Sequence, residues 1–268
     1  MPDDHERAVA RHYQVSDLTQ RVLKAAAAAG LDPGRLTPAD LAPIDEFHIG
    51  GREATKHVVA KMRLAGSERV LDVGCGIGGA ARYVAVSTGC HVTGIDLTPE
   101  YIETARALSG RMGLGARTAF EAGSALQMPF ADASFDAAIT LHVAMNIKDR
   151  AGLYRETARV LKRGGVFCIY DVMKGVNDEL RYPMPWADTE ASSHLTTPEE
   201  MQELLTTAGF SVEEVEDRTD FGIAFFRGRL SAGGTSSPLG LHVLMGETSR
   251  ESPTICSRIS SAEPSLPW

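Results

Sequence analysis

The chain has 268 residues, of which 43% are hydrophobic and 23% charged, as in an ordinary soluble globular protein. Asp and Glu outnumber Lys and Arg by 35 to 27, and the net charge of −8 argues against duplex nucleic acid as a partner, since binding it requires a basic surface. Because the sequence has neither a long apolar run nor a start typical of a secretory signal, we expect a cytoplasmic protein of one or two domains that does not enter a membrane.

The N-terminal segment, residues 1–51, precedes the regular part of the chain. Apolar side chains at helical spacing predict one helix over residues 6–29 that ends at Gly30. Residues 31–51 are rich in Pro and Gly and predict a loop, with a short helix beginning at Thr37.

From residue 52 onward, helical patterns alternate with short runs rich in Val and Ile. The helices predicted here cover residues 53–64, 79–88, a segment that begins after Thr98, and 149–161. The strands predicted here cover residues 69–73, 91–96, 118–121, 135–141 and 166–172. This alternation is typical of βαβ units and predicts an α/β domain with a parallel sheet. Gly164 and Gly165 are expected to close the helix before the last of these strands.

The pattern changes in the last third of the chain. Residues 174–194 form an irregular insert rich in Pro and aromatic side chains, and helices are predicted over 198–208 and 220–232. Two more strands are predicted over 210–216 and 239–245, which gives seven in total. The α/β domain would thus cover residues 52–246, followed by an irregular tail over 247–268.

The four cysteines do not form a CxxC pair. Because Cys75, Cys90, Cys168 and Cys256 are widely spaced, we expect free thiols and neither a disulfide framework nor a metal site.

A glycine-rich turn between a strand and a helix is the densest signal in the sequence. The segment VLDVGCGIGG (residues 70–79) follows the predicted strand 69–73, and its glycines permit a tight turn and a close approach of a ligand to the backbone. Gly74, Gly76 and Gly79 also satisfy the dinucleotide-binding pattern GxGxxG, so an NAD-dependent oxidoreductase stays open at this point.

Polar residues stand at the carboxyl ends of four predicted strands. They are Asp72, Asp96, His142 and Asp171. Open α/β sheets bind ligands at this edge, so the topology alone is expected to bring these side chains together.

Four segments in order along the chain resemble the motifs of class I S-adenosylmethionine-dependent methyltransferases. They are DVGCGIGGAARYVA, GIDLTPEYIETARAL, LQMPFADASFD and ARVLKRGGVFCIYD. Two others, DEFHIGGREAT and YPMPWA, resemble glycine, sarcosine, dimethylglycine and phosphoethanolamine methyltransferases. The resemblance implies a doubly wound, Rossmann-like, mainly parallel sheet of seven strands with an N-terminal helical lid.

The resemblance also implies S-adenosyl-L-methionine as the cofactor and assigns residues to it. Asp72 would lie near its ammonium group, and Asp96 would hold the ribose. The other cofactor-binding residues implied are Gly74, Cys75, Gly76, Leu97, Ser124, Ala125, Leu126, Leu141, Gly50 and Gly51.

The residues expected near the methyl acceptor come from three loops and the first helix. His142 is the candidate catalytic residue, because its strand end faces the crevice. Tyr13, His48, Asn146 and Trp186 are candidate substrate-binding residues, and Trp186 could contact a methylated ammonium through its ring face. Each also has a structural alternative, in which Tyr13 and Trp186 belong to the core and His48 makes a local hydrogen bond.

These observations predict methylation of a small molecule, with N-methylation of an amine as the first hypothesis. The alternatives are C- or O-methylation of a secondary metabolite or quinone precursor, and a module that binds the cofactor without catalysis. The sequence leaves a homodimer open.

Overall fold

The computed structural model describes residues 4–13, 16–46, 48–175, 180, 182–184, 186–187, 189–231, 239–240 and 242–245. The predicted tail over 247–268 and Cys256 lie outside these residues. The three cysteines that are described are free thiols.

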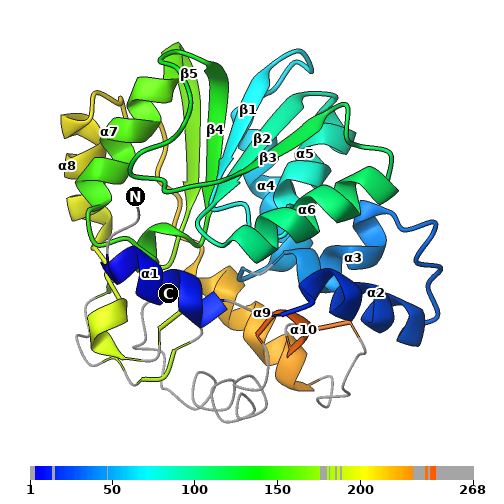
Figure 1. Cartoon of the computed structure of the whole chain (residues 1–268). Helices are drawn as coiled ribbons and strands as arrows, with labels where there is room; N and C mark the ends of the chain where they lie inside the picture. Colours follow the sequence, from blue (N-terminus) through cyan, green and yellow to red (C-terminus); the bar gives the residue numbers. More distant parts are fainter. Residues whose placement is uncertain are drawn as a thin grey trace.

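A parallel sheet forms the centre of the molecule (Figure 1). Its strands are β1 (Arg69–Val73), β2 (His91–Asp96), β3 (Thr118–Ala122), β4 (Phe135–Leu141) and β5 (Leu161–Tyr170). They pair in the order β3-β2-β1-β4-β5, and every pairing is parallel. The order reverses beside β1, so a crevice is expected where β1 and β4 diverge at their carboxyl ends.

Helices cover both faces of the sheet and one end of it (Figure 1). They are α1 (Asp4–Tyr13), α2 (Leu18–Ala28), α3 (Pro38–Asp45), α4 (Gly51–Met62), α5 (Gly79–Thr88), α6 (Pro99–Arg111), α7 (Arg150–Val160), α8 (Pro198–Thr207), α9 (Thr219–Ser231) and α10 (His242–Met245). Two short 3-10 helices, η1 (Ala144–Asn146) and η2 (Glu190–Ser192), complete the described elements. In the part of the chain that the structure describes, no helix combines the length and hydropathy needed to cross a bilayer.

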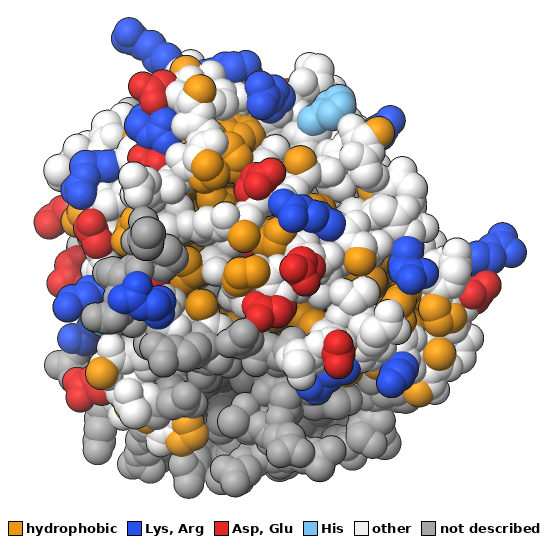
Figure 2. Space-filling model, in the orientation of Figure 1, with side chains coloured by type: hydrophobic (Ala, Val, Ile, Leu, Met, Phe, Trp, Pro, Cys, Tyr) orange, Lys and Arg blue, Asp and Glu red, His pale blue; other side chains and the backbone are white. Residues whose placement is uncertain are grey.

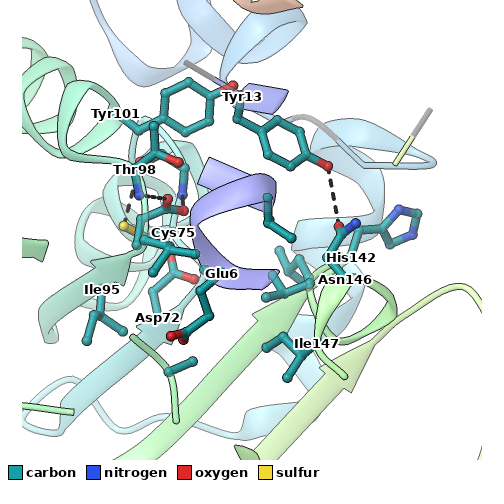
Figure 3. A pocket seen from close by; sticks show the side chains of 18 of the residues that line it. Glu6, Tyr13, Asp72, Cys75, Ile95, Thr98, Tyr101, His142, Asn146 and Ile147 are labelled. Atoms are coloured by element: carbon teal, nitrogen blue, oxygen red, sulfur yellow. Dashed lines mark hydrogen bonds between the residues drawn. The ribbon is translucent and has the colours of Figure 1, made fainter. Parts of the chain in front are cut away.

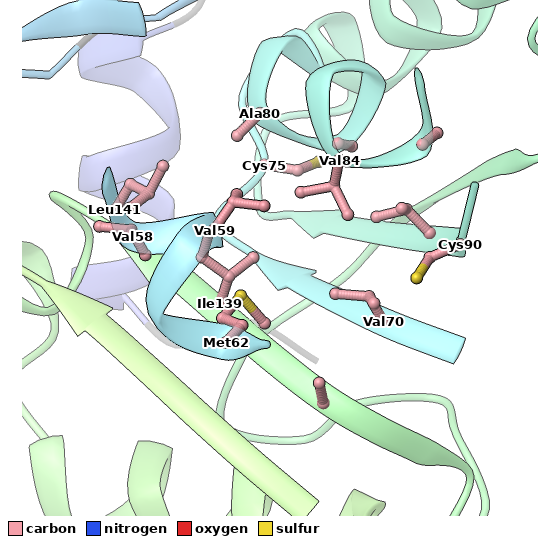
Figure 4. Packing of buried hydrophobic residues seen from close by; sticks show 14 of the residues in the cluster. Val58, Val59, Met62, Val70, Cys75, Ala80, Val84, Cys90, Ile139 and Leu141 are labelled. Atoms are coloured by element: carbon pink, nitrogen blue, oxygen red, sulfur yellow. The ribbon is translucent and has the colours of Figure 1, made fainter. Parts of the chain in front are cut away.

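Alternate residues of β1 point to opposite faces of the sheet and join different clusters. Val70 packs with Val58, Val84 and Ile139 in the core between the sheet and helices α4 and α5 (Figure 4). Leu71 belongs to the cluster that α7 and α8 cover on the other face. The core is therefore two-sided, as the alternating βαβ pattern predicts, and it fixes the strand ends that carry the polar residues.

The N-terminal helices are packed on the domain. Leu23 of α2 and Leu41 of α3 share a buried cluster with Tyr101 and Leu108 of α6. Thr37 caps α3 in a reciprocal capping box with Asp40, which agrees with the predicted helix start. The single helix predicted over 6–29 is wrong, because α1 ends at Tyr13 and a new helix begins at Leu18.

Two strand predictions differ from the structure. Residues 210–216 have no strand assignment, and residues 242–245 are helix α10, so seven strands are not confirmed and the described residues form five. Leu239, Val243 and Leu244 are buried together against α2, and a spacing of four and five residues suits a helix better than an alternating strand.

The glycine pair before β5 also differs from its prediction. Gly164 and Gly165 do not close a helix, because α7 ends at Val160 and the strand begins at Leu161. Pairing with β4 shifts register between Phe135 and Ala137, and the glycines lie on β5 where this irregularity is accommodated, with Gly164 at a φ of 77°.

On the face shown in Figure 2, acidic and basic side chains are interspersed with hydrophobic ones. The described side chains on this face therefore form no continuous basic surface of the kind that neutralises phosphates.

Candidate active site

A cavity of about 500 Å³ lies at the carboxyl ends of the strands, within the size range of small-molecule sites. Strand ends, the glycine turn and helix α1 all contribute to its lining. In the view of Figure 3, Asp72, Cys75 and Thr98 lie on one side of α1, and His142, Asn146 and Ile147 lie on the other. We call the first region the cofactor half and the second, with Tyr13 and His48, the acceptor half.

The glycine turn forms the backbone wall of the cofactor half. Gly74 and Cys75 both donate their amide hydrogens to the carbonyl of Ile95, over 2.8 and 3.0 Å, so the turn is tied to β2. Gly74 has a φ of 73°, and a Cβ atom there would collide with the side chain of Val143. Gly76 has a φ of 53° and no atom within 4 Å of the place where a Cβ would stand, which leaves room for a ligand.

Two buried carboxyl groups, Asp72 and Asp96, form the floor of the cofactor half. The Asp72 residue is 2% exposed, and its Oδ2 has no hydrogen-bond partner in the described structure. Burial, reinforced by the nearby charge of Asp96, raises the pKa of Asp72 to about 7. A cationic group bound beside these side chains would stabilise their ionised forms.

Asp96 links the glycine turn to the start of α6. Its Oδ2 accepts from the amide of Gly76 and its Oδ1 from the amide of Thr98, each over 2.9 Å. Burial raises the pKa of Asp96 despite these hydrogen bonds. Each carboxylate oxygen can accept a further hydrogen bond, so Asp96 is suited to hold the hydroxyl groups of a ribose.

The acceptor half is lined by two neutral histidines. His142 follows β4 with a φ of 54°, and its amide donates to the carbonyl of Tyr170 over 2.7 Å. Its ring centroid lies 5.0 Å from that of Tyr170 and 6.0 Å from that of His48. Burial lowers the pKa of His142 well below its ordinary value and that of His48 to about 4. Both rings are therefore uncharged at neutral pH.

Helix α1 covers the cavity, and two of its side chains contact Asn146. Tyr13 Oη donates to Asn146 Oδ1 over 3.3 Å, and His5 Nε2 lies 3.0 Å from the Asn146 carbonyl. Asn146 Nδ2 in turn donates to the carbonyl of Trp186 over 2.6 Å. Asn146 thus connects the lid helix to the insert on the far side of the cavity.

The structure brings most of the predicted site residues to this cavity. Those in its lining are Tyr13, His48, Asp72, Gly74, Cys75, Gly76, Asp96, Leu97, Ala125, Leu126, Leu141, His142 and Asn146.

Four predicted residues lie outside the lining. Gly50 packs against the ring of Phe221, and Gly51 begins α4. Ser124 donates a hydrogen bond to Glu6 of α1. Trp186 is buried in a small cluster behind Asn146, and its Nε1 donates to Ser193 over 3.0 Å. Trp186 therefore supports a lining residue.

Several lining residues were absent from the prediction. They are His5, Glu6, Val9, Asp45, Ile77, Ala80, Ile95, Thr98, Tyr101, Gly123, Val143, Ile147, Lys148, Asp149 and Leu244. Thr98 and Tyr101 could have been found, because they follow Asp96 at the start of a helix. The residues of α1 carry no motif, and only the tertiary fold brings them to the site.

Comparison with known proteins identifies the family. The model described as "Methyltransferase domain" matches residues 71–169. O-methyltransferase resE of Aspergillus sclerotiorum is 32% identical over 181 residues, which are 66% of this chain and 67% of that protein. The chain belongs to the S-adenosylmethionine-dependent methyltransferases. This assignment removes the NAD-dependent alternative.

Another curated relative and a solved structure extend the comparison. Sterol 24-C-methyltransferase ERG6B of Gibberella zeae is 35% identical over 164 residues, which are 58% of this chain but only 43% of that protein. The solved structure of the cyclase SpnF is 24% identical, with a TM-score of 0.69 over 96% of this chain and 92% of its own. That likeness confirms the Rossmann-like fold.

The residues of the cofactor half fit S-adenosylmethionine, the cofactor of this methyltransferase family. The open space at Gly76 accommodates a chain close to the backbone, and the unpartnered Oδ2 of Asp72 suits a ligand that carries positive charge. Solved structures of the same fold hold S-adenosylmethionine or S-adenosylhomocysteine.

Proposed function

We propose that this methyltransferase methylates a small organic acceptor bound between helix α1 and the carboxyl ends of β4 and β5. One observation carries the proposal: a single cavity joins a carboxylate-floored glycine turn to a wall of uncharged histidines. The first region suits a cationic cofactor, and the second suits an uncharged acceptor placed directly beside it.

In this proposal the cofactor half binds by three kinds of contact. Asp72 offers a carboxylate to the ammonium group, and Asp96 offers one to the ribose hydroxyls. Leu97, Ala125 and Leu126 supply the apolar surface for the adenine ring of the cofactor. Leu141 lies in the lining of the same cavity. When bound, S-adenosylmethionine supplies an activated methyl group on a sulfonium, whose sulfur keeps the electron pair as the methyl leaves.

The protein's main contribution is then to align the acceptor. Holding two reactants at near-attack distance can lower a barrier by roughly 7–11 kcal/mol. Tyr13, His48 and Asn146 are proposed to orient the acceptor, and α1 keeps water out of the cavity. His142 is proposed to line the reacting atoms at the end of β4.

A hydroxyl group is the acceptor that this half of the cavity favours. The carboxyl groups nearby already interact with other groups: Glu6 accepts from Ser124, Asp149 caps α7, and the charge of Asp45 is balanced by Arg82, which donates to Oδ1 while Oδ2 has no partner among the described residues. A cationic substrate would thus find little free negative charge there, whereas neutral imidazoles can accept a proton from a hydroxyl.

N-methylation, the first hypothesis from the sequence, stays as the second candidate. The burial that lowers the pKa of His48 to about 4 also acts on a bound amine, because desolvation disfavours any cation. An amine in this cavity would tend to lose its proton and become nucleophilic. C-methylation requires an activated carbon acceptor, and none of the contacts between described residues of the cavity favours it.

Methyl transfer can be tested with isotope-labelled S-adenosylmethionine and two acceptor panels. The first holds catechol and simple phenols, and the second holds glycine, sarcosine, dimethylglycine and ethanolamine. We expect label in the phenols and S-adenosylhomocysteine binding by calorimetry. Label only in the amines would reverse the order of the two candidates. Tight binding of S-adenosylhomocysteine without transfer to either panel or to a metabolite extract would favour a non-catalytic module.

A further inference from the structure

A buried polar network lies behind the acceptor half. Its centre is Glu46, whose side chain is fully buried and accepts hydrogen bonds from Arg52 Nε and Thr55 Oγ1. Thr55 Oγ1 lies 3.0 Å from His48 Nε2, so the network extends from Glu46 to a ring that lines the cavity.

The hydrogen bonds of this network determine which nitrogen of His48 carries the hydrogen. Nε2 lies 3.0 Å from the carbonyl oxygen of Gly51, which can only accept. Thr55 uses its own hydrogen for Glu46, so its oxygen also accepts from Nε2. Nε2 must therefore donate, and in the neutral ring the lone pair lies on Nδ1.

The groups around His48 keep its ring neutral. Burial and the charge of Arg52 lower its pKa, against the effect of the Gly51 carbonyl. The rings of His142 and Tyr170 pack against it, with centroids at 6.0 and 6.3 Å. The only carboxylate in ion-pair range among the described residues is Glu46, whose Oε2 lies 3.8 Å from Nε2.

His142 lacks such a network. No hydrogen bond from another described residue fixes its ring, although it lies at the strand end where the sequence predicts the catalytic residue. Its backbone amide is bonded to Tyr170, and its ring makes aromatic contacts only. The two histidines of the acceptor half thus differ in how their ring nitrogens are held.

We propose that His48 is the proton acceptor of the methyl transfer, and that Glu46 is a positioning residue that acts on it through Thr55. This inference rests on the proposed function and assigns it a protic acceptor. As the acceptor oxygen forms its bond to the methyl group, its O–H bond breaks and the proton passes to Nδ1 of His48. The resulting imidazolium keeps its Nε2 hydrogen bonds and faces the Glu46 carboxylate, and it later returns the proton to solvent.

The tautomer of His48 can be measured without any acceptor. Long-range ¹H–¹⁵N spectra of the imidazole nitrogens in the full-length protein should show a neutral ring with hydrogen on Nε2 between pH 6 and 8. His48→Gln identifies the signal. Hydrogen on Nδ1, or a protonated ring in this range, would overturn the proposal whether or not an acceptor is known.

Variants of Thr55 test the connection from Glu46. With catechol as the probe, Thr55→Val should lower kcat at least tenfold, and Thr55→Ser should restore it because the hydroxyl returns. His48→Gln should lower kcat about 10²–10⁴-fold, the usual contribution of a general base, and remove the acidic limb of the pH–rate profile. His57→Gln is the matched control, since His57 is half-exposed and paired with Glu216.

Binding of S-adenosylhomocysteine separates this inference from the proposed function. All of these variants should bind it within twofold of the parent protein, because none of the three positions belongs to the cofactor half. Equal kcat in Thr55→Val and Thr55→Ser, or an active His48→Gln, would refute the role of His48 while leaving the methyltransferase activity intact. A parent protein that transfers no methyl group would instead count against the proposed function.

Discussion

The two halves of the cavity are built in different ways. In the cofactor half, Asp72 and Asp96 come from the ends of the consecutive strands β1 and β2. Backbone amides of the glycine turn connect these two ends, because Gly74 donates to the carbonyl of Ile95 and Gly76 donates to the carboxylate of Asp96. In the acceptor half, Tyr13, His48 and Asn146 come from three separate segments that line one cavity, and Tyr13 is joined to Asn146 by a side-chain hydrogen bond.

This difference separates residues that the fold itself requires from residues that can vary between proteins with the same fold. The turn after β1 has little freedom, because a side chain at Gly74 would displace Val143. In the acceptor half the comparable backbone constraint is at His142, with its φ of 54°, whereas Tyr13 and Asn146 are joined through a side-chain hydrogen bond that a substitution can change by itself. Substitutions should therefore act on cofactor binding in the first half and on the acceptor in the second.

The largest effect is expected at Asp96. Asp96→Asn removes the charge that we assign to the ribose, and two charge-assisted hydrogen bonds at about 1.5–3 kcal/mol each imply a loss of about 100-fold or more in affinity for S-adenosylhomocysteine. Isothermal calorimetry measures it. Glu121→Gln on the adjacent strand, where the side chain is half-exposed, serves as the control and should bind normally. If Asp96→Asn bound S-adenosylhomocysteine with the affinity of the parent protein, the distinction between the two halves would not hold.

A pair of glycine variants separates backbone strain from steric collision. Gly74 and Gly113 have similar φ values, 73° and 70°, but a Cβ at Gly113 meets nothing within 4 Å. Gly74→Ala should lower the free energy of unfolding by about 1–3 kcal/mol more than Gly113→Ala, because only the former must displace Val143. Urea denaturation measures both, and equal losses would show that strain alone matters.

The raised pKa of Asp72 makes both the stability of the protein and the binding of the cofactor depend on pH. With a pKa of about 7, its carboxyl holds a proton in the folded protein between about pH 4 and 7, while the unfolded chain does not. This contribution to stability is therefore greatest below pH 4 and is lost as the pH rises through about 7.

The ammonium group of S-adenosylhomocysteine, which we assign to Asp72, favours the ionised carboxylate, so binding should release a proton below pH 7. Affinity for S-adenosylhomocysteine should rise about tenfold from pH 6 to pH 8, and Asp72→Asn should flatten that slope. Calorimetry in two buffers of different ionisation enthalpy counts the protons. A slope that Asp72→Asn leaves unchanged would assign the pH dependence to another group.

The smallest effect is expected at the lid. Tyr13→Phe removes one hydrogen bond to Asn146, worth about 1 kcal/mol, and should raise hydrogen exchange of the α1 amides about fivefold. Tyr83→Phe, outside the cavity lining, is the control. A change in S-adenosylhomocysteine affinity larger than the change in exchange would mean that α1 belongs to the cofactor half.

The fold was predictable where local signals agreed with the tertiary structure. The ranges 69–73, 91–96 and 135–141 match β1, β2 and β4 at both ends, because buried Val and Ile runs are bounded by turn residues. The strand predicted over 239–245 failed because Leu239, Val243 and Leu244 are buried against α2, which no local pattern reveals.

The site residues at the strand ends were predictable from the sequence, and those contributed by α1 were not. Asp72 and Asp96 follow from topology, since parallel strands end at one edge. His5 and Glu6 do not, because only the packing of α1 over the strand ends brings them there. The homodimer and the cytoplasmic location stay predictions.

The ion pair between Arg82 of α5 and Asp45 of α3 limits how far the chain can be shortened from its N-terminal side. Both side chains are fully buried, 2.7 Å apart, and Arg82 also donates to Ser109 of α6 over 3.2 Å. A fragment limited to residues 71–169, the part that defines the family, would leave the Arg82 cation without its counter-charge. That costs about 3–5 kcal/mol, a large share of a typical domain's 5–15 kcal/mol. The segment that matches the family and the length of chain that keeps this buried ion pair are therefore different, and the latter must include Asp45.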